Sequence, residues 1–509
     1  MPKVPLLLAI DIGTESSRAC LLKDNGEVVA TASTEHSLSC PNPGWAEQDP
    51  MDWWKATVRN IRAVIEQSRC DPDQIAAVGA AAQMHAAVPI SGSGELLSSA
   101  ALLWCDKRSA DICDQLNTEY DEMELVRQTG NALVPSWTGP KIRWLKDNLP
   151  DQYRNTWKYL SCSGFINYML TGAVATDYSE ASGTYLFDAH KKTWSPELCE
   201  LLGVDIAKLP DIFPAQHVVG KVSKAAAAST GLKEGTLVVN GGGDMMCILL
   251  GAGLVTEGRA CDITGTAADI SVYVPEPLYD KRLMHLHSVG TDGWIAFGIL
   301  DAGGGSLRWF KDVFAPEQVR EARARGMSPY AVLSELAADV EPGSEKLMFF
   351  PYLLGERTLG SSHSSGVFFG FRYTHGIGHC ARAIMEGVTF DLKQSLDLIK
   401  AKGIRVDEIR AIAGGAQSEV WRSIKANVYG HPVVTLENFE GGLLGAAILA
   451  GIGAGIYHDA VSAVDKIVKV GARMEPDLET HQKYQQYYEL FKDLHDQLQP
   501  FFVRMTELD

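Results

Sequence analysis

Apolar runs broken by glycine-containing turns predict a three-stranded β-meander at the start of the chain. The first run is continuous and ends at an acid, and the third follows the hairpin signal Asp24-Asn25-Gly26. Apolar side chains then recur every three or four residues, which predicts a helix. The expected strands are residues 5–10, 18–23 and 27–31, and the expected helix is 52–67.

The same strand–turn–strand pattern returns in the second half of the chain. Residues 259–264 and 268–274 are predicted strands, and Gly265-Thr266 forms the turn between them. Two copies about 250 residues apart indicate a repeated domain. We place the boundary near Thr256, which predicts an N-terminal domain at 1–256 and a C-terminal domain at 257–509. No long Pro- or Ser-rich linker separates the halves, so we expect them to pack closely around a hinge.

Length and charge narrow the classes of protein that this chain can belong to. A chain of 509 residues is too long for one ordinary core, which agrees with two domains. The net charge of -17 disfavours nucleic acid and anionic membranes as partners. Ten cysteines are scattered singly, without the spacing of a zinc site or a disulfide framework, and predict reduced thiols in the cytoplasm. The glycine-dense apolar run at 441–457 is predicted to be a buried helix rather than a membrane span.

The turn after the first strand carries the groups of a phosphate site. Gly13 lets the backbone approach phosphate oxygens, Thr14 can donate a hydrogen bond and Arg18 can offset charge. Asp11 could hold magnesium through water. A plain hairpin turn explains this segment alone equally well, but Gly265-Thr266 is its counterpart in the second half. Two such turns would grip a polyphosphate from both sides, so we expect the two halves to share one cavity.

Two glycine-rich segments add candidate chemistry. Asp244 follows three glycines, and a lone carboxylate there suits a general base for an attacking hydroxyl. It equally suits capping of the following helix. The strand predicted at 409–413 opens through Gly414-Gly415 onto a helix at 419–429, which makes a good platform for a nucleotide. The chain has neither GxGxxG nor Walker A, so Rossmann and P-loop folds are disfavoured.

These segments together resemble the FGGY family of carbohydrate kinases, in the family's order and over nearly the whole chain. DIGTESSR (11–18) and TGT (264–266) are similar to its two phosphate motifs, and NGGGD (240–244) to the segment with its catalytic aspartate. FPYLLGERT (350–358) and AGGAQSEVWRSIKANVYGHPV (413–433) are similar to its later signatures, the second being its adenosine segment. The resemblance implies an α/β fold of two actin/hexokinase-like (ribonuclease H-like) domains with a central cleft. It also implies that ATP and Mg²⁺ are bound.

The resemblance further implies a role for each matching position. Asp244 corresponds to the general base, and Asp11 to the magnesium-associated acid. The lobes would close to expel water and align the γ-phosphoryl group with a sugar hydroxyl. The positions that match nucleotide contacts are Thr14, Arg18, Gly265, Thr266, Gly305, Gly415, Ala416 and Ser418.

Three further segments resemble the xylulose kinases within that family. They are Gln83-Met84-His85 (their QMH), WCDKR at 104–108 (their W-x-D-x-R) and GWAEQDP at 44–50 (their W-x-E-Q-D-P). Polar side chains here would pair with sugar hydroxyls, while apolar ones would pack on carbon–hydrogen faces. The implied sugar contacts are Gln83, Met84, His85, Trp104, Asp106 and Arg108. The implied reaction is phosphorylation of a primary hydroxyl of a small ketose, D-xylulose to D-xylulose 5-phosphate.

Some residues depart from the family pattern and keep alternatives open. Glu15 adds a negative charge beside the expected phosphates, and Ala86 follows QMH where the family has glycine. Another ketose, a polyol or a sugar acid is therefore an alternative substrate. An actin- or chaperone-like ATPase would share the paired turns, but the polar set around Gln83 and His85 disfavours it. The oligomeric state is left open, with a homodimer as one candidate.

Overall fold

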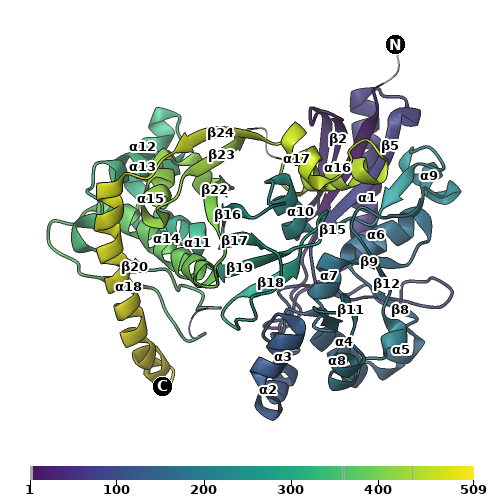
Figure 1. Cartoon of the computed structure of the whole chain (residues 1–509), viewed down its shortest axis with the longest axis horizontal. Helices are drawn as coiled ribbons and strands as arrows, with labels where there is room; N and C mark the ends of the chain where they lie inside the picture. Colours follow the sequence, from purple (N-terminus) through teal and green to yellow (C-terminus); the bar gives the residue numbers. More distant parts are fainter. Residues whose placement is uncertain (1–3, 358, 360–361, 438–439, 509) are drawn as a thin grey trace.

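The chain folds into two lobes, each built on a mixed β-sheet (Figure 1). The computed structural model describes residues 4–357, 359, 362–437 and 440–508, so Thr358 of the FPYLLGERT segment lies outside it. The first-lobe sheet has the order β13 (Val218–Lys221), β14 (Leu237–Val239), β5 (Ile75–Ala82), β1 (Leu6–Ile12), β2 (Ser16–Lys23), β3 (Val28–Glu35), with β15 (Gly242–Gly243) beside β5. The second-lobe sheet has the order β18 (Met284–His287), β19 (Trp294–Leu300), β17 (Ala268–Val274), β16 (Gly258–Thr264), β22 (Val406–Ile412), β23 (Val433–Glu437), β24 (Lys469–Met474).

The two sheets repeat one arrangement. In the first lobe an antiparallel meander β1–β2–β3 has β5 lying parallel to β1. In the second lobe the antiparallel meander β16–β17–β19 has β22 lying parallel to β16. The strands predicted on either side of both turns are therefore confirmed, and so is the two-domain α/β fold.

Helices cover both faces of the first-lobe sheet because side chains of β1 alternate between two cores. Leu6, Leu8 and Ile10 pack with Trp53 and the rest of α1 (Pro50–Ser68). Leu7 and Ala9 instead join the core of α10 (Asp244–Gly251) and α16 (Gly442–Gly453). The amphipathic helix predicted at 52–67 is confirmed as α1, which begins at the N-cap Asp49.

Helix α16 comes from the C-terminal half of the chain but packs on the first-lobe sheet, beside β1 and β5 (Figure 1). Its glycines and alanines allow this approach. A Cβ on Gly79 of β5 would lie 2.3 Å from the Ala446 carbonyl oxygen, and one on Gly445 would lie 2.0 Å from that of Cys247. The buried helix predicted at 441–457 is confirmed. The domain boundary near Thr256 stays a prediction, since α16 places a later segment on the first lobe.

The second lobe surrounds its sheet with longer helices. Helix α14 is almost entirely buried, and the long C-terminal helix α18 packs at the outer side of the lobe (Figure 1). The main helices are α11 (Gly303–Phe314), α12 (Pro316–Arg325), α13 (Pro329–Ala338), α14 (Ile377–Ala401), α15 (Glu419–Tyr429) and α18 (Leu478–Met505). The predicted helix at 419–429 is confirmed as α15. Across the described residues, every helix is too short or too polar to cross a bilayer.

The lobes also touch through an insertion of the first lobe. This insertion carries α3 (Glu122–Thr129), α4 (Thr138–Asn148) and α7 (Tyr178–Ser182). Asn131, which follows α3, exchanges two hydrogen bonds of 2.8 Å with the backbone of His285 in β18. Strand β18 therefore connects the second-lobe sheet to this insertion of the first lobe.

Candidate active site

The first-lobe turn places a buried carboxylate next to a cation. Asp11 lies near the end of β1, and Arg18 faces it across the antiparallel pair with β2. The Arg18 guanidinium donates to Asp11 Oδ2. Burial raises the pKa of Asp11, while the charge of Arg18 opposes this rise. The start of α16 adjoins the pair, because a Cβ on Gly442 would lie 3.2 Å from Asp11 Oδ1. Sequence reasoning did not anticipate this neighbour.

Asp244 and the QMH segment lie side by side. Strand β5 ends just before Gln83, and Gly242-Gly243 runs parallel to its last residues. A Cβ on Gly243 would lie 2.5 Å from Met84 Sδ, so only glycine allows this packing. Asp244 follows at once as the first residue of α10. Gly243 is the N-cap residue there, so the capping role considered for Asp244 is wrong.

Asp11 acts electrostatically on the pKa of Asp244. Burial, and then the charge of Asp11, raise the pKa of Asp244 to about 7. Hydrogen bonds from the backbone N–H groups of Met245 and of Asp244 itself oppose this rise, and the bond from Met245 to Asp244 Oδ1 measures 2.7 Å. The first lobe therefore brings together the acid expected near magnesium and the expected base, with a proton affinity matched to neutral pH.

A chain of hydrogen bonds joins two of the predicted sugar contacts, Trp104 and Gln83, through Thr14 and Gln48. Trp104 Nε1 donates to Thr14 Oγ1 at 3.0 Å, and Gln83 Nε2 donates to Gln48 Oε1 at 2.7 Å. Gln48 also donates to the Thr14 carbonyl at 2.6 Å. Gln48 was missed as a site residue, although the GWAEQDP segment that contains it was singled out. Thr14 thus contacts Gln48 and Trp104, and its predicted role at the phosphates stays a prediction.

The side chains of Asp106 and Arg108 are paired with each other and with other groups of the protein. Asp106 is fully buried, and both its oxygens accept from Arg108 while Oδ2 also accepts from the Ala46 backbone N–H at 2.7 Å. Arg108 also bonds Glu47 at 2.7 Å and stacks on the Trp45 ring, 3.8 Å from its centroid. This cluster fastens the GWAEQDP loop to the WCDKR segment. A direct contact of Asp106 or Arg108 with sugar stays a prediction.

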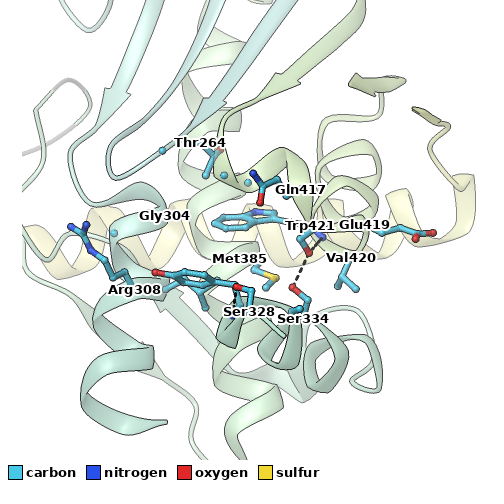
Figure 2. Close-up of a pocket in the computed structure, with 18 of the residues that line it drawn as sticks. Thr264, Gly304, Arg308, Ser328, Ser334, Met385, Gln417, Glu419, Val420 and Trp421 are labelled. Carbon is cyan, nitrogen blue, oxygen red and sulfur yellow. Dashed lines mark hydrogen bonds between the residues drawn. The ribbon is translucent and has the colours of Figure 1, made fainter. Parts of the chain in front are cut away.

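The second lobe contains a cavity of about 660 Å³ between the β16–β17 turn, α11, α13 and α15 (Figure 2). The β16–β17 turn and the first residues of α11 and α15 give part of the cavity a glycine-rich, polar lining. Trp421 and Met385 contribute to its apolar lining. Ser418 caps α15 by accepting from Trp421 N–H at 3.2 Å and bonds Ser334 at 3.0 Å. The predicted nucleotide residues that line the cavity are Gly265, Thr266, Gly305, Gly415 and Ser418.

Other predicted nucleotide residues lie outside this cavity. Ala416 is buried beside it, and its carbonyl accepts from Arg422 at 2.6 Å. Thr14 and Arg18 belong to the other lobe, as do Asp11 and Asp244. The described lining of this cavity therefore contains the second-lobe turn but none of these four first-lobe residues. The shared cavity expected from the sequence stays a prediction that requires the lobes to approach each other.

A buried ion pair lies at the end of β16, next to the second-lobe turn. Lys425 Nζ, fully buried, donates to Asp262 Oδ1 at 2.5 Å and to Thr264 Oγ1 at 2.7 Å. Tyr429 donates to the other Asp262 oxygen at 2.7 Å. A Cβ on Gly415 would lie 2.6 Å from that of Thr264, so this cluster touches the cavity wall. The sequence indicated Lys425 only as part of a helix.

Known proteins share both halves of this architecture. Residues 6–251 match the N-terminal domain, and residues 263–454 the C-terminal domain, of the FGGY family of carbohydrate kinases. The chain is 30% identical to the xylulose kinase of Bacillus subtilis over 492 residues, covering 96% of each chain. It is 28% identical to the gluconokinase of the same organism over 504 residues, covering 98% of each.

A solved structure agrees with these likenesses. The crystal structure of xylulose kinase from Rhodospirillum rubrum matches with a TM-score of 0.91 at 30% identity, covering 98% of this chain and 100% of that one. The likenesses favour a carbohydrate kinase over an actin- or chaperone-like ATPase.

Proposed function

The chain belongs to the FGGY family of carbohydrate kinases, and we propose that it transfers the γ-phosphoryl group of ATP to a primary hydroxyl of D-xylulose, giving D-xylulose 5-phosphate. The observation that carries this proposal is the packing of Met84 against Gly243, directly before Asp244. It sets the segment that resembles the sugar motif beside the carboxylate that resembles the base.

Asp244 acts as the general base in this proposal. Its carboxylate takes the proton of the sugar hydroxyl while the hydroxyl oxygen forms a bond to the γ-phosphorus and the bond to the ADP oxygen breaks. The cavity of the second lobe holds ATP in this proposal. Thr266 and the first residues of α11 lie near the phosphates, and Trp421 lies near the adenine ring. Closure of the lobes brings the γ-phosphoryl group to Asp244 and excludes water.

The residues beside Asp244 fit a bound magnesium ion. Mg²⁺ is usually held by one or two carboxylates together with substrate phosphates, so a dedicated all-protein cage is not required. Asp11 would supply such a carboxylate beside the ATP phosphates, and its charge contributes to the raised pKa of Asp244, the neighbouring base. When bound, the ion supplies charge that offsets the phosphate oxygens.

The charges near the QMH segment favour a neutral ketose over a sugar acid. Arg108 is paired with Asp106 and Glu47, and Arg357 with Asp301. Lys141 is fully buried and donates to two backbone carbonyls. A sugar carboxylate would have to compete with these existing partners, while hydroxyl groups can use Gln83 and the ring of His85.

A substrate panel tests the proposed function. Pentuloses, polyols and aldonates are compared in a coupled assay for ADP release, and D-xylulose is expected to give the highest kcat/KM. The product is then examined for a phosphate on the terminal carbon. A higher kcat/KM for gluconate or a polyol would overturn the substrate assignment, and ATP turnover indifferent to every sugar would overturn the kinase proposal.

The pKa of Asp244 predicts the pH profile. The base is active when deprotonated, so kcat/KM should fall about tenfold per pH unit on the acid side of an apparent pKa near 7. Because the charge of Asp11 raises the pKa of Asp244, Asp11→Asn should move the acid limb to lower pH. If the acid side of the kcat/KM profile does not move in that variant, Asp11 does not raise the pKa of Asp244.

A further inference from the structure

The backbone of His85 is held in an unusual conformation. Its φ is 66°, in the left-handed region that residues other than glycine avoid, because Cβ there approaches the following carbonyl. Such a conformation persists only where the surroundings over-determine it, and it is frequent at binding sites. Here it occurs in the middle of the segment that resembles the sugar motif.

Two buried side chains, Lys141 and Glu180, form hydrogen bonds with the backbone carbonyl and the backbone N–H of His85. Lys141 Nζ donates to the His85 carbonyl at 3.0 Å, and the His85 N–H donates to Glu180 Oε2 at 3.2 Å. Lys141 comes from α4 and Glu180 from α7, so the two contacts reach His85 from separate elements. The imidazole ring packs edge-on against Trp137, with 5.0 Å between the ring centroids.

General stability does not explain Lys141. Its side chain is fully buried, and it donates hydrogen bonds to the backbone carbonyls of His85 and Ser136, the second at 2.8 Å. Burying an amine against carbonyl groups is unfavourable compared with an apolar side chain of the same volume. Burial lowers the pKa of Lys141 to about 7, which shows how strongly this site disfavours the charged amine. Lys141 therefore fixes the positions of the two carbonyls that it bonds, although its burial lowers the stability of the fold.

We propose that Lys141 and Glu180 are positioning residues that fix His85 in the left-handed conformation, and thereby aim its imidazole and the adjacent Met84 at the sugar beside Asp244. The inference rests on the proposed function, because it assigns the sugar to this segment. Lys141 and Glu180 act through His85 rather than by touching the substrate. Glycine at position 183 leaves room for the ring, since a Cβ there would lie 2.4 Å from His85 Cε1.

Substitutions that remove one bond at a time test the proposal. Lys141→Met and Glu180→Met should each raise the KM for the sugar about tenfold or more, because small displacements at a binding site have large effects. The KM for ATP should stay unchanged, since the nucleotide cavity lies in the other lobe. Glu180→Gln keeps an acceptor for the His85 N–H and should restore the low KM.

Lys146→Met is the matched control. Lys146 lies on the same helix and also donates to a backbone carbonyl, that of Gly203, away from His85. This variant should keep the sugar KM of the native enzyme even if it melts at a lower temperature. If Lys141→Met does not fold, the Glu180→Met and Glu180→Gln pair provides the same comparison.

A structural measurement separates this proposal from the proposed function. In a crystal structure of Lys141→Met, residue 85 should leave the left-handed region. A positive φ at residue 85 together with an unchanged sugar KM would overturn the proposal, whatever happens to the melting temperature. If the native enzyme phosphorylates no sugar, the proposed function fails, and the conformation of residue 85 alone then decides whether Lys141 and Glu180 hold it.

Discussion

Replacing Asp244 by Asn should lower kcat about 100-fold or more while ATP still binds with near-native affinity. The amide has the size of the carboxylate but cannot accept the proton of the attacking hydroxyl. The second-lobe cavity that we propose for ATP does not include residue 244, so its walls should be unchanged. Steady-state kinetics with D-xylulose and calorimetric titration of ATP measure the two effects separately.

Glu317→Gln is the matched control for this substitution. Glu317 also stands in the first turn of a helix, α12, but its side chain is 79% exposed. Glu317→Gln should show the native kcat. A low kcat in Asp244→Asn alone would then come from loss of the general base, and not from loss of an acidic residue in the first turn of a helix. A kcat near the native value in Asp244→Asn would reject Asp244 as the base, and equal losses in both variants would point to a general effect on helix starts.

Local sequence patterns were sufficient for the elements that carry the turns. Asp11 closes an apolar strand, and the adjoining residues have the polarity of a hairpin, so β1 and β2 could be predicted from neighbouring residues alone. Helix α15 was predicted at its observed bounds because a strand, two glycines and an apolar period follow one another there. Such signals depend on spacing within a few residues, which a single sequence displays directly.

Partners distant in the chain could not be predicted in this way. Gly442 reaches Asp11 across more than 400 residues of sequence, and its glycine-rich surroundings indicated only a buried helix. Lys141 and Lys425 looked like ordinary polar positions of helices, although both are fully buried. Their burial is set by tertiary contacts with His85 and Asp262, and no periodicity reveals which distant group will face a lysine.

Lys425→Met should lower the free energy of unfolding by about 3–5 kcal/mol, because it leaves the charge of Asp262 buried without its cation. Both side chains are fully buried, so water cannot replace the lost partner. Denaturant unfolding measures the loss as a lower midpoint at unchanged slope. Lys233→Met removes an exposed pair with Asp73 of 3.0 Å and should cost at most about 1 kcal/mol.

The double variant Lys425→Met with Asp262→Leu separates the stability of this ion pair from its effect on the nucleotide cavity. Removing both charges eliminates the uncompensated carboxylate, so most of the lost stability should return. Thr264 Oγ1 would still lack its hydrogen bonds with Lys425 and Asp262, and Thr264 lies at the start of the turn that lines the cavity. ATP affinity should therefore stay reduced in the double variant. Native ATP affinity with restored stability would show that the ion pair stabilises the lobe without shaping the turn.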